Sequence, residues 1–173
     1  FGAKGSVHLF ERDCSMQRRY QKIIEESPAP EVDRELINNM AQAAVKLSSD
    51  VKYEGAGTVE FIYDVQEMKY YFLEMNTRIQ VEHPVTELVT NNDLISMQIN
   101  FAFNRKNKFL NQNKIKTYGH SIECRVYAED PSQNFLPSPG KITKLKFPKI
   151  PNGIRLDWGC LLYTSDAADE GVR

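Results

Sequence analysis

Apolar residues recur at helical spacing over residues 33–49, and this pattern predicts the most regular helix of the chain. The apolar stripe of this helix consists of Leu36, Met40, Ala43 and Leu47. Asp33 stands directly before the stripe and is a favourable N-cap residue. A second stripe, made of Leu94, Met97 and Phe101, predicts another helix over residues 92–103.

Runs rich in β-branched and aromatic residues predict strands. Two such runs, residues 58–64 and 70–76, read as an antiparallel hairpin joined by residues 65–69. Residues 121–128 alternate apolar and polar positions, and shorter strands are expected over residues 7–10, 142–147 and 154–156. Residues 21–26 fit either a strand or one helical turn, and the pattern does not decide between them. Pro28 and Pro30 end this segment. The mixture of helices and antiparallel strands favours an α+β fold.

The composition excludes several classes of protein. The chain has 173 residues, of which 41% are apolar and 26% charged, and its formal net charge is −1. This balance does not fit a disordered chain, and it lacks the basic surplus typical of nucleic-acid binding. No stretch approaches the roughly 20 apolar residues of a membrane span. Three cysteines without a CxxC pair, and no secretory signal, favour a reducing compartment and a cytoplasmic location. The absence of an initiating Met leads us to expect further sequence upstream.

Two carboxylates, Glu60 and Glu74, lie inside the expected strands of the hairpin, where such residues are uncommon. If Asp64 pairs with Tyr70, Glu60 faces Glu74 across the hairpin, and like charges directly opposite each other destabilise a sheet. A divalent cation between them removes the conflict, and carboxylate and amide oxygens, such as that of the nearby Asn76, suit Mg²⁺ or Mn²⁺. The alternative is that both side chains face solvent on an exposed face of the sheet.

A basic, an amide and an acidic residue follow the hairpin at a spacing of two. Arg78, Gln80 and Glu82 would share one side of an extended segment. The planar fork of an arginine suits a small planar oxyanion, and a neighbouring glutamate can accept a proton. A metal and phosphate site beside an oxyanion site indicates phosphoryl transfer to a carboxylate-like acceptor.

Three motifs together resemble the biotin carboxylase family. They read ERDCSMQRR at residues 11–19, FLEMNTRIQVEHPVTE at residues 72–87 and FLPSPG at residues 135–140. The resemblance extends from the start of the chain to about residue 159, and it implies the C-terminal half of an ATP-grasp domain followed by the start of the biotin carboxylase C-terminal domain. The expected division is residues 1–118 for the first part, residues 119–160 for the second, and a disordered or non-native tail at residues 161–173.

The resemblance also implies roles for individual residues. The metal ligands would be Glu60, Glu74 and Asn76, binding Mg²⁺ or Mn²⁺. Bicarbonate would be bound by Lys22, Arg78, Gln80, Val81 and Glu82, and ATP would be contacted by Gln17, Ile62, Glu60 and Glu74. Glu82 would be the general base that deprotonates bicarbonate, with Arg78 beside the reacting anion. The carbonate would attack ATP to give carboxyphosphate, and Arg155 would stabilise the enolate of biotin.

The family likeness sets further expectations for the whole protein. The partners would be a biotin carboxyl carrier protein and a carboxyltransferase, in a homodimer that binds neither nucleic acid nor membrane. Acetyl-CoA carboxylase is the expected context. Pyruvate, propionyl-CoA and methylcrotonyl-CoA carboxylases, or an inactive interaction module, are the alternatives. Tyr20 stands where the family commonly has a nucleotide-contacting histidine, and the Gly-rich lid of the family is absent from this chain. The isolated 173-residue chain is therefore expected to be inactive and only marginally stable.

Overall fold

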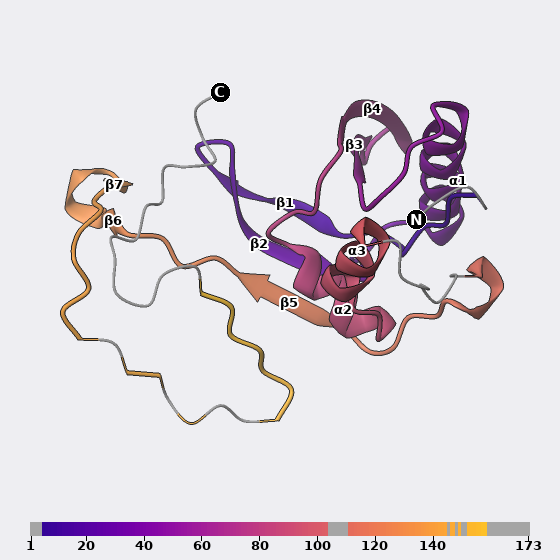
Figure 1. Cartoon of the computed structure of the whole chain (residues 1–173). Helices are drawn as coiled ribbons and strands as arrows, with labels where there is room; N and C mark the ends of the chain where they lie inside the picture. The colour runs from indigo at the N-terminus through magenta and orange to yellow at the C-terminus, as the bar shows by residue number, and fades with distance from the viewer. Residues whose placement is uncertain (1–4, 104–110, 145, 148, 150–151, 159–173) are drawn as a thin grey trace. The chain divides into compact units, whose positions relative to one another are not determined.

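The computed structural model describes residues 5–103, 111–144, 146–147, 149 and 152–158. The chain divides after Cys124 into two compact units, each of which is described by itself. Within its described residues, the first unit contains a three-stranded sheet, a separate two-stranded hairpin and the helices α1 to α3 (Figure 1).

The three-stranded sheet is antiparallel, with the strand order β1-β2-β5. Its strands are β1 (Asp13–Arg18), β2 (Gln21–Ser27) and β5 (Ser121–Cys124). The segment left open between strand and helical turn is therefore a strand. Arg19 and Tyr20 form the turn between β1 and β2, and both have positive φ, at 51° and 64°. Positive φ at both central residues is the backbone of a two-residue hairpin turn of the kind that matches strand twist.

Two strand predictions in this unit were wrong or too long. Residues 7–10 form no strand, because Phe10 adopts φ 66° and the His8 N–H donates to Oε1 of Gln112 at 2.9 Å instead of to a neighbouring strand. The strand predicted over residues 121–128 ends at Cys124. Its alternating apolar residues do not mark a buried face, since Ile122 is 59% exposed and Val126 is 97% exposed.

The hairpin predicted after residue 57 is present as β3 (Thr58–Asp64) and β4 (Lys69–Asn76). Asp64 pairs with Lys69, so the register at the turn is one residue away from the predicted one. A bulge between Glu60 and Phe61 absorbs this difference, and beyond it Glu60 pairs with Glu74 as predicted. The two carboxylates therefore lie opposite each other in the sheet.

The helices are α1 (Arg34–Asp50), α2 (His83–Thr90) and α3 (Leu94–Ala102). The helix expected over residues 33–49 is confirmed, and the side chain of Asp33 caps it by accepting from the N–H of Leu36 at 2.9 Å. The second predicted helix is confirmed over a shorter span. Helix α2 was not predicted, because the residues before it suggested an extended segment. None of the helices in the described residues is long and apolar enough to cross a membrane.

Helix α2 packs against β2 and β5, and this contact forms the interior of the first unit (Figure 1). Val85 and Val89 of α2 are each 1% exposed. The interior is unusually polar for its size. Its buried polar side chains are Glu25, Ser27, Gln80, Glu82, Thr86, Thr90 and Ser121. Because buried polar groups need partners, this interior is organised by hydrogen bonds as much as by apolar packing.

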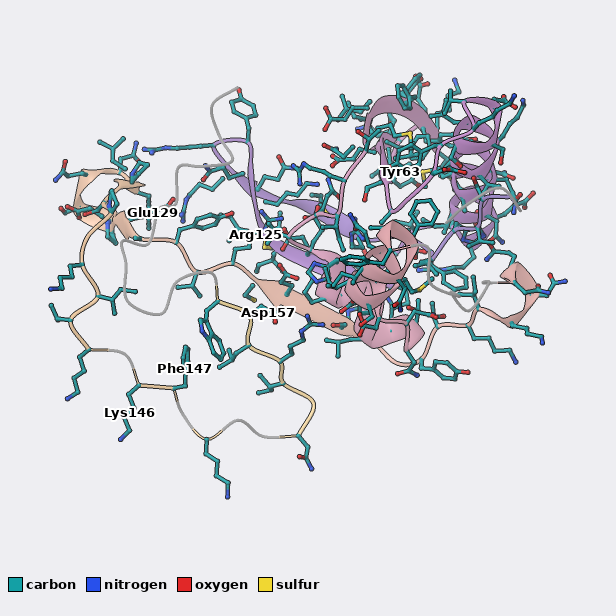
Figure 2. All side chains as sticks on the ribbon, viewed as in Figure 1. Tyr63, Arg125, Glu129, Lys146, Phe147 and Asp157 are labelled. Carbon is teal, nitrogen blue, oxygen red and sulfur yellow. The ribbon has the colours of Figure 1, made fainter. Side chains whose placement is uncertain are left out.

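The described residues of the second unit carry little regular structure. The strands β6 (Glu129–Asp130) and β7 (Leu136–Pro137) pair with each other, and 3₁₀ turns cover Pro131–Gln133 here and Gln112–Lys114 in the first unit. The ring of Phe147, which Figure 2 labels, stacks on Trp158. The two ring centroids are 4.8 Å apart. The strands predicted over residues 142–147 and 154–156 are absent from the described residues there. The tail predicted at residues 161–173 lies outside the described residues.

Candidate functional site

The ammonium of Lys22 links two carboxylates that come from distant parts of the chain. Its Nζ lies 2.8 Å from Oε1 of Glu60 and 2.8 Å from Oε1 of Glu82. Lys22 belongs to β2, Glu60 to β3, and Glu82 directly precedes α2. The side chains of Lys22, Glu60 and Glu82 are 18%, 20% and 3% exposed. One cation therefore joins the two sheets and the start of a helix in a largely dry environment.

Glu60 accepts several hydrogen bonds in this cluster. Besides Lys22, its Oε1 accepts from Nε2 of Gln80 at 2.9 Å and from Nδ2 of Asn76 at 3.2 Å. The same Asn76 nitrogen donates to Oε1 of Glu74 at 2.8 Å. A single amide thus bridges the two opposed carboxylates of the hairpin, which places both of them on one face. This is the pairing that the sequence predicted for Glu60 and Glu74. The solvent-facing alternative does not describe Glu60, whereas Glu74 is exposed.

Electrostatics keep the cluster charged despite its burial. Burial by itself raises the pKa of Glu60, but the hydrogen bonds from Lys22 and Gln80 outweigh it and leave the pKa lowered. Burial likewise opposes the charge of Glu82, but the Lys22 hydrogen bond and a backbone N–H bring its pKa below the ordinary value. For Lys22, burial lowers the pKa, whereas the bonds to Glu60 and Glu82 raise it, and the raising effect is the larger.

The start of α2 explains how Glu82 tolerates its burial. Glu82 is the N-cap residue of α2, and its side chain makes no capping hydrogen bond. The carboxylate nevertheless stands beside the positive end of the helix dipole, where a negative charge is favoured. Pro84, the second residue of the helix, has a fixed φ, and the His83 ring nitrogen Nδ1 lies 2.8 Å from the carbonyl of Gln80. These two features restrict the backbone before and after Glu82.

The donor set of the hairpin fits a hard divalent cation. Within the described residues, His, Cys, Asp and Glu form no group of three or more that could hold a metal ion by themselves. Glu60 and Glu74 supply two carboxylates on one face, with the amide of Asn76 between them. Mg²⁺ commonly binds through one or two carboxylates and takes its other ligands from phosphates and water. The residues present therefore suit a metal that arrives with a nucleotide.

Arg78 is not part of the bonded cluster. It is exposed, and its Nη1 donates to the carbonyl of Ile79 at 3.2 Å. The prediction that Arg78, Gln80 and Glu82 share one side of an extended segment was wrong, because residues 81–82 form a turn into α2. As a result Gln80 and Glu82 are 7% and 2% exposed, whereas Arg78 faces solvent.

The remaining predicted site residues lie outside the hydrogen-bonded cluster. Gln17 is exposed and donates to the carbonyl of Cys14 at 2.9 Å. Ile62 and Val81 are 55% and 43% exposed. Arg155, in the second unit, pairs through Nε with Asp157 at 2.9 Å. Of the predicted residues, the structure thus joins Lys22, Glu60, Glu74, Asn76, Gln80 and Glu82.

Sequence reasoning missed Arg12. Its guanidinium donates to Oγ1 of Thr86 at 2.8 Å, to Oγ1 of Thr58 at 3.1 Å and to Oε1 of Gln80 at 2.9 Å. The only signal in the sequence was its place in the ERDCSMQRR motif, where several charges stand together. Nearby Cys14 is no candidate nucleophile, because burial raises its pKa to about 11 and the thiol keeps its proton at neutral pH.

Two family models match the chain. The model described as the ATP-binding domain of the carbamoyl-phosphate synthase L chain matches residues 3–109. The model of the biotin carboxylase C-terminal domain matches residues 123–165. Together they follow the order of parts that the motifs implied.

Curated relatives are similar to this chain over most of its length. Biotin carboxylase 1 of Bacillus subtilis is 56% identical over 152 residues, which are 88% of this chain and 33% of the relative. The alpha subunit of mouse mitochondrial methylcrotonoyl-CoA carboxylase is 50% identical over 154 residues, which are 89% of this chain and 21% of the relative. The chain thus spans about a third or less of the length of these relatives.

Solved structures agree with the fold. A biotin carboxylase of Campylobacter jejuni, in complex with a β,γ-ATP ligand, matches with a TM-score of 0.76 and 51% identity over 84% of this chain and 32% of that chain. The biotin carboxylase domain of Hydrogenobacter thermophilus 2-oxoglutarate carboxylase, with MgADP, ADP and bicarbonate, matches with a TM-score of 0.76 and 45% identity over 83% of this chain and 31% of that chain. The chain therefore belongs to the biotin carboxylase family, as a segment that runs from the ATP-grasp domain into the start of the C-terminal domain.

Proposed function

We propose that the protein containing this segment carboxylates biotin on a carrier protein, using ATP and bicarbonate through carboxyphosphate. The observation that carries the proposal is the position of Lys22, 2.8 Å from both Glu60 and Glu82. A cation-binding carboxylate and a carboxylate suited to proton transfer then share one ammonium. This shared contact brings the proposed site of the ATP phosphates and the proposed site of bicarbonate within a few ångströms of each other.

Glu82 is the proposed general base, and Lys22 controls its strength. A bicarbonate anion entering beside Lys22 attracts the ammonium away from Glu82. Glu82 then loses the hydrogen bond that lowers its pKa, so it becomes a stronger base as the substrate arrives. Glu82 takes the proton of bicarbonate, and a carbonate oxygen attacks the γ-phosphorus of ATP. The bond to ADP breaks, and carboxyphosphate forms. Arg78, exposed at the end of the hairpin, is the proposed second cationic contact for the anion.

The proposed nucleotide site uses the same face of the hairpin. Glu60 and Glu74 would hold Mg²⁺ or Mn²⁺, which neutralises the charge that develops on the phosphates. Because Oε1 of Glu60 already accepts three hydrogen bonds, its Oε2 is the better-placed oxygen for a cation. Asn76 directs its amide nitrogen at both carboxylates, so it has to turn its Oδ1 toward them before it can act as a ligand. Gln17 and Ile62 complete the proposed ATP contacts, whereas Val81 belongs to the proposed bicarbonate contacts.

Carboxyphosphate then releases CO₂ and phosphate, and the phosphate takes the proton of the biotin ureido nitrogen. Arg155 is the proposed group that stabilises the resulting enolate, because its fixed positive charge faces no reorganisation when an oxyanion forms. The ion pair with Asp157 holds the guanidinium from its Nε side. A biotin carboxyl carrier protein and a carboxyltransferase are the proposed partners, in a cytoplasmic homodimer. The free Cys14 and Cys124 support a reducing compartment.

Acetyl-CoA carboxylase is the proposed context of this half-reaction. A second candidate is the same step in an enzyme of another acceptor, which the 50% identity to a methylcrotonoyl-CoA carboxylase subunit supports. Carboxyl transfer from the full-length protein's carboxybiotin to acetyl-CoA, compared with methylcrotonyl-CoA and pyruvate, separates them. Transfer to acetyl-CoA alone supports the first candidate, and transfer to either other acceptor overturns it.

Glu82→Gln in the full-length protein tests the base. This change keeps the shape of the side chain but removes its ability to accept a proton, and we expect carboxybiotin formation to fall by about 10²- to 10⁴-fold. Glu67→Gln is the matched control, because Glu67 pairs with Lys69 at an exposed turn. Carboxybiotin formation that is unchanged in Glu82→Gln rules out the role of Glu82.

A further inference from the structure

Within the described residues, the guanidinium of Arg12 donates hydrogen bonds to three segments of the first unit, and none of its acceptors is a carboxylate. Its Nη1 donates to Thr86 of α2, and its Nη2 donates to Thr58 at the start of β3 and to Gln80 before α2. The acceptors are two hydroxyls and one amide oxygen, all neutral. These neutral acceptors indicate an orienting role for the half-buried guanidinium, in addition to the positive charge by which Arg12 helps to lower the pKa of Glu82.

The important acceptor is Gln80, because an amide has two different ends. Its Oε1 accepts from Arg12 at 2.9 Å, so its Nε2 is directed the other way, toward Oε1 of Glu60 at 2.9 Å. A flipped amide would turn its NH₂ toward the guanidinium and its oxygen toward the carboxylate. Both contacts would then be repulsive. Gln80 is only 7% exposed, so water has little access to replace either bond.

We propose that Arg12 is a positioning residue, which fixes the amide of Gln80 so that its NH₂ points into the Lys22–Glu60–Glu82 cluster. The inference deepens the proposed function and rests on it, since Gln80 belongs to the proposed bicarbonate set. A bicarbonate oxygen needs donors, and a fixed NH₂ supplies one at no cost of reorientation. Without Arg12, the buried Oε1 of Gln80 loses its donor, and the side chain is held by one bond instead of two.

Lysine cannot take over this task. The guanidinium reaches Thr86 through one terminal nitrogen and both Thr58 and Gln80 through the other. An ammonium offers a single nitrogen and no planar fork, so it cannot serve all three acceptors in this geometry. Arg12→Lys therefore keeps the positive charge and removes the orientation, and it separates the two possible roles of the residue.

The test is a double-mutant cycle in the full-length protein, measured as kcat and KM for bicarbonate in bicarbonate-dependent ATP hydrolysis. Arg12→Lys and Gln80→Met should each raise the KM for bicarbonate by about tenfold, the size of one hydrogen bond to a charged group, with less effect on the KM for ATP. If Arg12 acts through Gln80, the double variant should differ from Gln80→Met by less than about twofold. An unchanged KM in Arg12→Lys, or a product of the two effects near one hundredfold, overturns the inference.

A matched control and a milder variant guard against a folding defect. Arg34 also donates through a guanidinium, to Glu11 and to the carbonyl of Ala29, outside the cluster. Arg34→Lys should leave the KM for bicarbonate unchanged. If Arg12→Lys does not fold, Thr86→Val removes one anchor of Arg12. Thr86→Val should raise this KM by about threefold, and only when Gln80 is present. A rise of the same size in the Gln80→Met background overturns the inference.

The two proposals fail in different ways. A parent protein that hydrolyses no ATP in response to bicarbonate removes the proposed function itself. An active parent in which the effects of Arg12→Lys and Gln80→Met multiply leaves the proposed function intact, and removes only the positioning role of Arg12.

Discussion

Two hairpins meet at the charged cluster, and they differ in how they reach it. In the β1–β2 hairpin, Lys22 stands two residues after the tight turn at Tyr20. In the β3–β4 hairpin, Glu60 lies at the end of the strand away from its turn. The first hairpin was left undecided by the sequence, and the second was predicted. The ion pair between Lys22 and Glu60 thus joins the turn end of one hairpin to the open end of another.

The registers of the two hairpins explain what such a site requires. Both carry irregularities, between Asp13 and Gln17 in β1 and between Glu60 and Phe61 in β3. In β3–β4 the bulge shifts the pairing by one residue between Glu60 and Phe61, where the ring-packed part of the strand ends and the carboxylates begin. A bulge re-aims side chains, so the turn does not dictate the register at the functional end. The pairing of Glu60 with Glu74 and their bonds to Asn76 belong to that end.

The largest expected effect comes from breaking the link between the hairpins. Lys22→Met in the full-length protein leaves Glu60 and Glu82 facing each other without their shared ammonium. Removing one partner of a largely buried ion pair should cost about 3 kcal/mol of unfolding free energy, measured by urea unfolding at pH 7. Bicarbonate-dependent ATP hydrolysis should fall by at least about 10²-fold, because a preorganised cation is lost.

Lys46→Met is the matched control, since Lys46 pairs with Asp50 on the exposed face of α1. Its loss should lie within about 0.5 kcal/mol of the parent. Equal losses in the two variants would contradict the idea that the hairpins are held together at Lys22.

The sequence predicted what depends on local pattern and missed what depends on distant contacts. The α1 stripe, its Asp33 cap and the β3–β4 strands follow from neighbours a few residues apart. Glu60 and Glu74 were placed correctly because the predicted register holds beyond the bulge. Helix α2 was missed since the residues before it, up to Glu82, were interpreted as an extended segment.

The alternation of residues 121–128 led to a wrong prediction, because it suggested an apolar buried face that the structure does not have. Ile122 is exposed, while the buried position beside it is the polar Ser121. The interior next to β5 is polar, so apolar residues there do not identify the inner face. Arg12 was missed for a related reason, because its acceptors Thr58, Gln80 and Thr86 lie 46 to 74 residues away. No periodicity reports a contact of that separation.

The pH dependence of stability sharpens the comparison. The lowered pKa values of Glu60 and Glu82 mean that their contribution is present above the ordinary value of 4.5 and is lost as the pH falls through the lowered values. The raised pKa of Lys22 means that its contribution is present below 10.5 and is lost as the pH rises through the raised value. We therefore expect the stability difference between the parent and Lys22→Met to be greatest between these limits.

Below pH 4.5 that difference should shrink, because protonated carboxylates no longer need the ammonium. Urea unfolding of both proteins from pH 3 to pH 8 measures it. A difference that stays constant over this range would mean that Lys22 stabilises the fold by packing, and that the two hairpins are not joined by charge.

The smallest expected effect concerns the two turns themselves. Tyr20 closes the β1–β2 turn at φ 64° and is 98% exposed, and Met68 closes the β3–β4 turn at φ 51° and is 52% exposed. Glycine relieves the steric cost of a positive φ, but it also gains freedom in the unfolded chain, so each replacement should stabilise by only about 0.5 kcal/mol. Urea unfolding of Tyr20→Gly and Met68→Gly compares them. If the turns serve only to close their hairpins, the two gains should be equal. A gain in Met68→Gly with a loss in Tyr20→Gly would mean that the Tyr20 ring, and not only its backbone, supports the hairpin that carries Lys22.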